Sequence, residues 1–85
     1  MVRIRFTEMI DGTWDMRYVV QNSKEIDGIS HNINLKGNSS GFVSQAAAFT
    51  WIKSRIGSFG FVKADFKNII LKTKKEAPET DVNWD

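Results

Sequence analysis

The chain has 85 residues, with twelve Lys or Arg against ten Asp or Glu, and a net charge of +2. It contains no Cys and one His, so disulfides, thiol nucleophiles and thiolate metal sites are excluded. No Ser lies in a nucleophile turn and no phosphate-binding Gly-Lys-Ser/Thr loop is present, so we expect a protein without enzymatic activity, metal or cofactor.

The first predicted elements are two strands joined by a hairpin. Apolar and polar residues alternate over residues 2–7 and again over residues 14–21, which is the period of a half-buried strand. An Asp-Gly pair between the two runs predicts a tight turn. A three-residue loop that ends on a left-handed Gly12 pairs Phe6 with Met16 and keeps one face of the hairpin apolar.

A third strand is predicted between two loops. Residues 21–28 are polar and predict a connection, and residues 29–36 alternate as a strand with a polar outer face. Residues 37–41, rich in Gly and Ser, predict a second loop.

One helix is predicted, from residue 42 to residue 56. Ser39 or Ser40 offers an N-terminal cap, and Gly57 marks the stop. Its expected apolar stripe consists of Phe42, Phe49, Ile52 and Ile56.

The C-terminal part of the chain allows two interpretations. Residues 59–75 favour a strand with an irregularity near residues 67–68, although their apolar residues also fit one face of a helix. Pro78 marks the end of the fold. We therefore expect a basic domain over residues 1–75 and an acidic disordered tail over residues 76–85.

These elements predict a small two-layer α+β domain, with an antiparallel sheet in the order β-β-β-α-β and one helix packed on its apolar face. The hairpin register places Arg3, Arg5 and Arg17 on the opposite face, with Arg5 directly across from Arg17. Like charges in that position destabilise a sheet unless an anion lies between them, and Arg donates paired hydrogen bonds to phosphate oxygens. The alternative is neutralisation by Glu8, Asp15 and solvent.

The charge is divided unevenly along the chain. The first 75 residues carry twelve basic and six acidic residues, whereas the last ten carry four acids and no base. A basic body beside an acidic tail predicts a polyanionic ligand and a tail that competes for the same surface. The C-terminal lysines also fit the solvated side of an amphipathic element. The predicted nucleic-acid-binding residues are Arg3, Arg5, Arg17, Lys36, Lys63, Lys67, Lys72, Lys74 and Lys75.

Two tryptophans are candidate partner-binding residues. Trp51 lies off the apolar stripe of the predicted helix, with Arg55 one turn further on. An exposed Trp beside Arg would stack on a base, anchor a protein partner or support a homodimer; burial beneath a loop or the tail is the alternative. Trp84, among the acids of the tail, would dock on a partner or on the body. His31 alternates with apolar residues and is expected to be a hydrogen-bonded core or rim residue; a role as the base of a hydrolase is the alternative.

Residues 57–64 resemble the octamer of RRM domains, in which aromatic residues on a strand stack on RNA bases. The run Phe59–Val62 matches, whereas the leading basic residue, the first glycine and the last aromatic residue of the motif are replaced. The topology also differs: the motif follows a helix in this chain, whereas it follows a strand in an RRM. The alternative is that both Phe residues fill the core at the exit of the helix.

In its size, its lack of Cys, its Lys, Asn and Ile content and its acidic end, the chain resembles the small accessory proteins of large tailed phages. That resemblance implies a protein of the host cytoplasm that binds host or defence factors or inhibits toxin ribonucleases. No apolar run approaches the length of a membrane span. We therefore expect a cytoplasmic nucleic-acid-binding protein, RNA before DNA, that helps to inhibit a host ribonuclease or toxin. A protein-interaction module or homodimer that docks through Trp51 and the tail is the second hypothesis.

Overall fold

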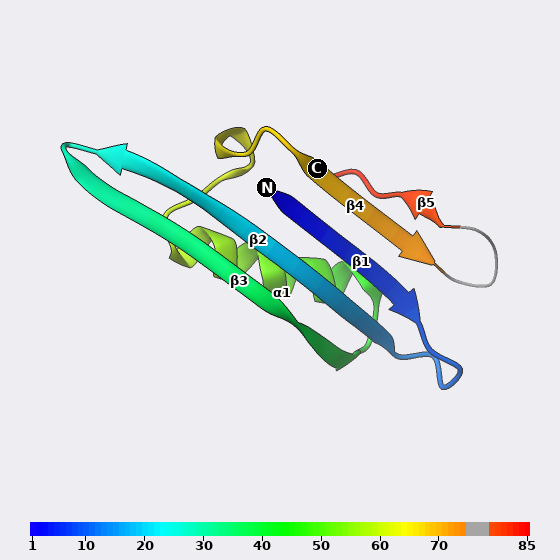
Figure 1. The fold of residues 1–85 in the computed structure, drawn as a ribbon. Helices are drawn as coiled ribbons and strands as arrows, with labels where there is room; N and C mark the ends of the chain where they lie inside the picture. Colours follow the sequence, from blue (N-terminus) through cyan, green and yellow to red (C-terminus); the bar gives the residue numbers. More distant parts are fainter. Residues whose placement is uncertain (75–78) are drawn as a thin grey trace.

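A computed structural model describes residues 1–74 and 79–85 of the chain. It shows one sheet with strand order β3-β2-β1-β4-β5 and one helix across a single face (Figure 1). The strands are β1 (Val2–Glu8), β2 (Trp14–Ile26), β3 (Ile29–Phe42), β4 (Ile69–Lys74) and β5 (Thr80–Asp81), and the helices are α1 (Gln45–Ser58) and the 3-10 turn η1 (Lys63–Asp65). Within this described part, no helix has the length and apolar character needed to cross a membrane.

The predicted α+β class and β-β-β-α-β order are confirmed, but the sheet is mixed and not antiparallel throughout. β1, β2 and β3 form an antiparallel meander, so β3 runs in the same direction as β1. α1 then returns the chain to the end where β1 begins, and β4 pairs with β1 in parallel. A helical crossover is the usual connection to a parallel strand.

The first hairpin forms with the predicted loop and register. The N–H of Met9 donates to the carbonyl of Thr13 at 2.8 Å, which closes a three-residue loop over residues 10–12. Gly12 has a φ of 86°, the left-handed conformation that this loop requires. Phe6 lies opposite Met16 as predicted.

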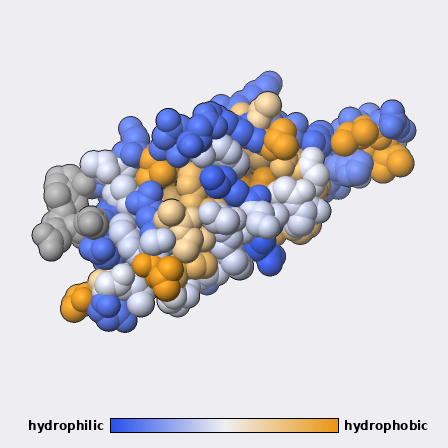
Figure 2. All heavy atoms as spheres, turned by 180° about the vertical axis from the view of Figure 1, so that it is seen from behind, coloured by the Kyte–Doolittle hydropathy of each residue, from blue (hydrophilic) through white to orange (hydrophobic). Residues whose placement is uncertain are grey.

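The predicted connection over residues 21–28 is wrong, because β2 and β3 form one long hairpin through this segment. Asp27 and Gly28 both have positive φ, 52° and 76°, as a two-residue type I′ turn requires. The end of the hairpin projects beyond the rest of the sheet (Figure 1). Ile26 and Ile29 beside the turn are 44% and 63% exposed, and apolar surface marks the projecting end in Figure 2.

The predicted loop over residues 37–41 is also wrong, because β3 continues through it. This segment pairs with β2 across a bulge, and Tyr18 lies opposite Gly37. A Cβ on Gly37 would lie 2.8 Å from the Tyr18 hydroxyl, so glycine here lets the tyrosine ring lie across the strand. Pairing with a neighbouring strand therefore outweighs the local loop propensity.

α1 is confirmed as a helix, but with different ends. Its N-cap is Ser44 rather than Ser39 or Ser40, and the Ser44 Oγ accepts the backbone N–H of Ala47 at 3.0 Å. At the other end the helix passes the predicted stop. Gly60, with a φ of 85°, takes the left-handed position after the helix and donates its N–H to the Gly57 carbonyl at 2.9 Å.

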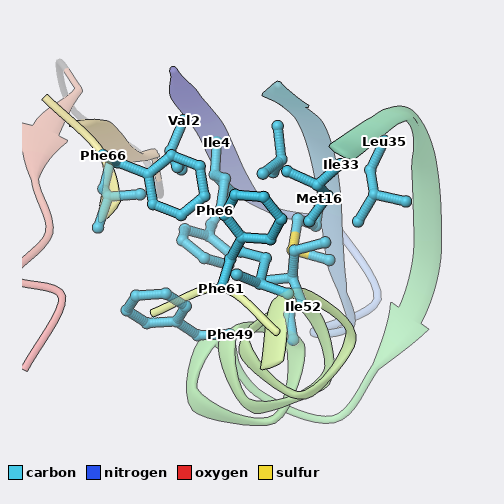
Figure 3. Packing of buried hydrophobic residues seen from close by; sticks show 14 of the residues in the cluster. Val2, Ile4, Phe6, Met16, Ile33, Leu35, Phe49, Ile52, Phe61 and Phe66 are labelled. Atoms are coloured by element: carbon cyan, nitrogen blue, oxygen red, sulfur yellow. The ribbon is translucent and has the colours of Figure 1, made fainter. Parts of the chain in front are cut away.

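The core lies between α1 and the face of the sheet that carries the alternating apolar residues (Figure 3). Phe6 of β1 meets Phe49 of α1 with a ring separation of 5.5 Å. Ile52 and Ile56 are buried as predicted, whereas Phe42 belongs to β3 and packs at the edge of the core. The core residues are Val2, Ile4, Phe6, Trp14, Met16, Val20, Ile33, Leu35, Ala48, Phe49, Ile52, Ile56, Phe61, Phe66 and Leu71.

Residues 59–75 divide into a crossover and a strand. A strand is confirmed only for β4, which begins directly after the predicted irregularity at residues 67–68. Residues 59–68 form an irregular connection that contains η1. Phe61 of this connection is 1% exposed and lies in the core (Figure 3).

A polar network ties the crossover to the long hairpin. The ammonium group of Lys24 donates to Asp65 at 2.9 Å and to the Gly60 carbonyl at 2.6 Å, and it lies 4.7 Å from the centre of the Phe61 ring. The Asn22 side chain donates to the backbone carbonyl of Asp65 at 2.6 Å. The hydrogen bond from Lys24, together with a backbone N–H, holds the pKa of Asp65 below its usual value. Lys24 is therefore engaged on the helix side of the sheet.

The described part of the acidic tail is folded against the body, which differs from the predicted disorder of residues 76–85. β5 pairs with β4, and the N–H of Val82 extends this pairing with a 3.0 Å bond to a β4 carbonyl. Trp84 then meets Phe49 edge to face, with ring centres 5.6 Å apart. Residues 76–78 lie outside the described part of the chain.

Candidate nucleic-acid interface

The sheet face opposite α1 (the outer face) collects the basic residues of β1, β2 and β4. The strand register places Arg17, Arg5 and Lys72 side by side on β2, β1 and β4. Neighbouring strands lie about 4.8 Å apart, so these three residues span roughly 10 Å. Asn38 and Asp81 continue the same row to the two edges of the sheet. The predicted position of Arg5 opposite Arg17 is confirmed. We call Arg17, Arg5 and Lys72 the basic row.

A second row runs beside the basic row and mixes charge with apolar surface. It contains Lys36, Val19, Arg3 and Ile70, in the order of the strands that carry them. Arg3 therefore lies between two aliphatic side chains, of which Ile70 is 43% exposed. Lys74 lies on the other side of the basic row, opposite Thr7 of β1. The predicted residues Arg3 and Lys36 thus share the outer face with the basic row.

Arg5 lies at the centre of the outer face. It lines a hollow of about 410 Å³ together with Arg3, Arg17 and Lys72, and a second hollow of about 340 Å³ that reaches Asn38. Because Arg residues line both hollows, an anion that enters either one meets more than one guanidinium group.

The charge on the outer face is balanced in part by the tail. Arg5 forms an ion pair with Glu79, with a further hydrogen bond of 3.3 Å, and Lys72 forms an ion pair with Asp81. The predicted alternative, neutralisation by carboxylates of the first hairpin, is not seen among the ion pairs of the described residues. The Arg5 side chain remains 58% exposed in spite of its partner.

The remaining predicted lysines do not extend the basic row. Lys63 lies in η1 and pairs with Asp85 at 2.8 Å, and Lys67 is exposed in the connection before β4. Lys75 lies outside the described residues. Of the C-terminal lysines, the register therefore brings Lys72 and Lys74 onto the outer face.

The candidate partner-binding residues have contacts within the chain. Trp51 is half-buried, with its ring 5.9 Å from those of Tyr18 and Phe42, and the Arg55 guanidinium lies 5.1 Å from its centre. Trp84 packs on the helix, as described above. Each tryptophan was a candidate either for binding a partner or for packing within the chain. Packing within the chain accounts for both observed positions.

The aromatic residues of the RRM-like segment are not on the outer face. Phe61 is buried in the core, and Phe59, 41% exposed, follows the C-terminus of α1. The strand positions that face outward in the described residues carry no aromatic side chain. The alternative interpretation, in which both Phe residues fill the core, is therefore correct for Phe61 and wrong for Phe59. His31 is half-buried opposite Lys24 on the projecting hairpin.

Sequence reasoning missed several members of this surface, among them Ile70 and Glu79. The apolar run that contains Ile70 fits either a strand or a helix, so the sequence does not predict which face carries this residue. The observed register places Ile70 beside Arg3. Glu79 lies in the segment predicted to be disordered; the acid excess predicts that this tail competes for the basic surface, but not that Glu79 contacts Arg5.

Comparisons of the chain with protein-family models, with curated proteins and with solved structures return no match. Within residues 1–74 and 79–85, no three acidic or histidine side chains form a group that could hold a metal ion. The chemistry of the outer face rests on its guanidinium, ammonium and amide groups, which donate hydrogen bonds to anionic oxygens.

Proposed function

We propose that this protein binds single-stranded nucleic acid, RNA in preference to DNA, through the outer face of its sheet. The observation that carries the proposal is the basic row, three cations at adjacent positions on neighbouring strands. Like charges placed directly opposite each other destabilise a sheet, so this arrangement favours an anionic ligand. Phosphates of a nucleic-acid backbone satisfy several such cations at once.

The surroundings of the row favour a single strand over a duplex. Val19 and Ile70 flank Arg3 with aliphatic surface, against which an unstacked base can pack while the guanidinium stacks on it or binds a phosphate. α1 covers the opposite face of the sheet, so the basic face presents no helix that could enter a major groove.

The preference for RNA rests on the amide side chains of β3. Asn34 and Asn38 face outward beside the basic row and the second row. Each amide both donates and accepts hydrogen bonds, as the ribose 2′-hydroxyl does, and this hydroxyl is what distinguishes RNA from DNA. A protein bound along RNA phosphates also shields them from ribonucleases. We therefore include inhibition of a host ribonuclease or toxin in the proposed function.

The salt dependence of binding measures the number of phosphates engaged. Three to five contacts from the outer face would give a slope of roughly −2 to −4 in a plot of log affinity against log salt for a single strand.

Fluorescence anisotropy with a labelled single-stranded RNA, the same sequence as DNA and a duplex tests the proposal. Arg17→Gln should weaken RNA binding, because it removes the contribution of β2 to the basic row. The matched control is Lys53→Gln, which makes the same change in charge on α1, where Lys53 lies 4.3 Å from the centre of the Phe49 ring. Equal loss in the two variants, or no loss in Arg17→Gln, contradicts the proposed site.

A second candidate function, association with another copy of the chain, is favoured by the open edge of the sheet. β3 is an edge strand of 14 residues with Lys36 as its sole Lys, Arg, Asp or Glu, whereas β5 at the other edge has two residues. Long edge strands without protecting charges pair readily with a second strand. Sedimentation equilibrium tests this second candidate. A dimer mass that persists at high salt supports self-association, and a monomer mass over the working concentration range contradicts it.

A further inference from the structure

We infer that the acidic tail from residue 79 onward is a built-in competitor of the nucleic acid, which docks on the basic face and must leave before the ligand can engage it fully. This inference rests on the proposed function and adds a regulation to the same site. Three tail carboxylates each contact a different cation of the body: Glu79 on Arg5, Asp81 on Lys72 and Asp85 on Lys63.

The tail occupies the positions where phosphates would bind. Glu79 lines the hollow that Arg3, Arg5, Arg17 and Lys72 enclose, and its carboxylate pairs with Arg5 at the centre of the outer face. A carboxylate and a phosphate use the same donors of a guanidinium group. Two of the three members of the basic row, Arg5 and Lys72, are therefore engaged by the tail, while Arg17 has no ion-pair partner in the described residues.

The tail is held by few contacts, which makes its displacement possible. β5 has two residues, and strands this short are weak when taken alone. Val82 adds one hydrogen bond to β4, Trp84 adds one edge-to-face contact with Phe49, and both side chains are partly buried against the core. The ion pairs are exposed to solvent, and such pairs contribute only about 0–1 kcal/mol each.

Docking of the tail and binding of nucleic acid are then linked. Each weakens the other by the same factor, since both compete for Arg5 and Lys72. Arg3 and Arg17 remain available for a first contact, after which the strand takes over the cations that the tail releases.

The first test removes the competing charges without shortening the chain. Glu79→Gln with Asp81→Asn should bind single-stranded RNA roughly three- to tenfold more tightly than the original chain, because two surface ion pairs no longer need to break. The matched control, Glu25→Gln with Asp27→Asn, removes two acids at the tip of the long hairpin. Both residues are exposed, and asparagine tolerates the positive φ of Asp27.

The second test loosens the tail without changing any charge. Trp84→Ala removes the contact with Phe49 and should also tighten RNA binding, whereas Trp84→Phe should restore most of the original affinity. A thermal unfolding scan of each variant shows that the body is folded at the temperature of the binding assay.

The outcomes separate this inference from the proposed function. Tighter binding by both tail variants, with the control close to the original affinity, supports the competitor role. RNA binding that is the same in the original chain and in both tail variants overturns the competitor role while the proposed function stands. Absence of RNA binding by every variant at low salt overturns both.

Discussion

Arg17→Glu should stabilise the fold while it weakens RNA binding, and this opposition follows from the position of Arg17 across from Arg5. In the original chain the two positive groups face each other on β2 and β1. The substitution replaces this repulsion with an attractive cross-strand pair, and such pairs contribute about 0.2–1 kcal/mol. Arg5 is 58% exposed and already has a carboxylate partner, so a gain near 0.5 kcal/mol is expected.

For a domain of this size, 0.5 kcal/mol corresponds to a rise in the melting temperature of about 2–4 °C. The same substitution should lower the affinity for single-stranded RNA about tenfold or more, because one phosphate contact is lost and a negative charge enters the basic row. The magnitude of the salt slope should decrease by about 0.7. Thermal unfolding followed by circular dichroism and anisotropy titrations on the same preparation measure both quantities. A lower melting temperature combined with unchanged RNA affinity would refute the reasoning.

Three further predictions concern the fold. Phe61→Ala should lower the free energy of unfolding by about 3–5 kcal/mol in urea titrations, because it leaves a cavity in the core. Phe59→Ala should change it by less than about 1 kcal/mol. Similar losses in the two variants would contradict the assignment of Phe61 to the core. Gly28→Ala should cost about 1–2 kcal/mol by the same measurement, because alanine is strained at a φ of 76°, and a neutral result would contradict the two-residue turn. Asp65 has a lowered pKa in the folded state, so its stabilising contribution is present above its unfolded pKa of about 4 and is lost as the pH falls through the folded value. Acid-unfolding curves should show a smaller fall in Asp65→Asn than in the original chain. The fall that remains includes the share of Asp11, whose pKa is also lowered, by its hydrogen bonds with Thr13. Identical curves would exclude the Lys24 network as a cause.

The parts of the fold that could be predicted depend on local patterns. The alternation in the first two strands, together with one Asp-Gly turn, is enough to set the register and hence the position of Arg5 opposite Arg17. The centre of α1 could be predicted for a similar reason, because its apolar residues recur with the helical period.

The parts that could not be predicted depend on partners far away in the sequence. Residues 21–28 look like a loop because Asn22 and Lys24 are polar, yet their partner Asp65 lies more than 40 residues further on. The tail looks disordered because its acids have no local partner. Its cations and the Phe49 ring come from distant elements that only the folded body brings together.

The most direct test of nucleic-acid binding on the outer face is a ¹H–¹⁵N NMR titration that follows the arginine Nε–H signals as single-stranded RNA is added. The chain has four arginines, of which Arg3, Arg5 and Arg17 lie on the outer face and Arg55 lies on α1, where it serves as an internal control. Saturable shifts of the three outer-face signals, with the Arg55 signal unmoved, are the predicted result. Shifts confined to Arg55, or equal small shifts of all four signals, would contradict it.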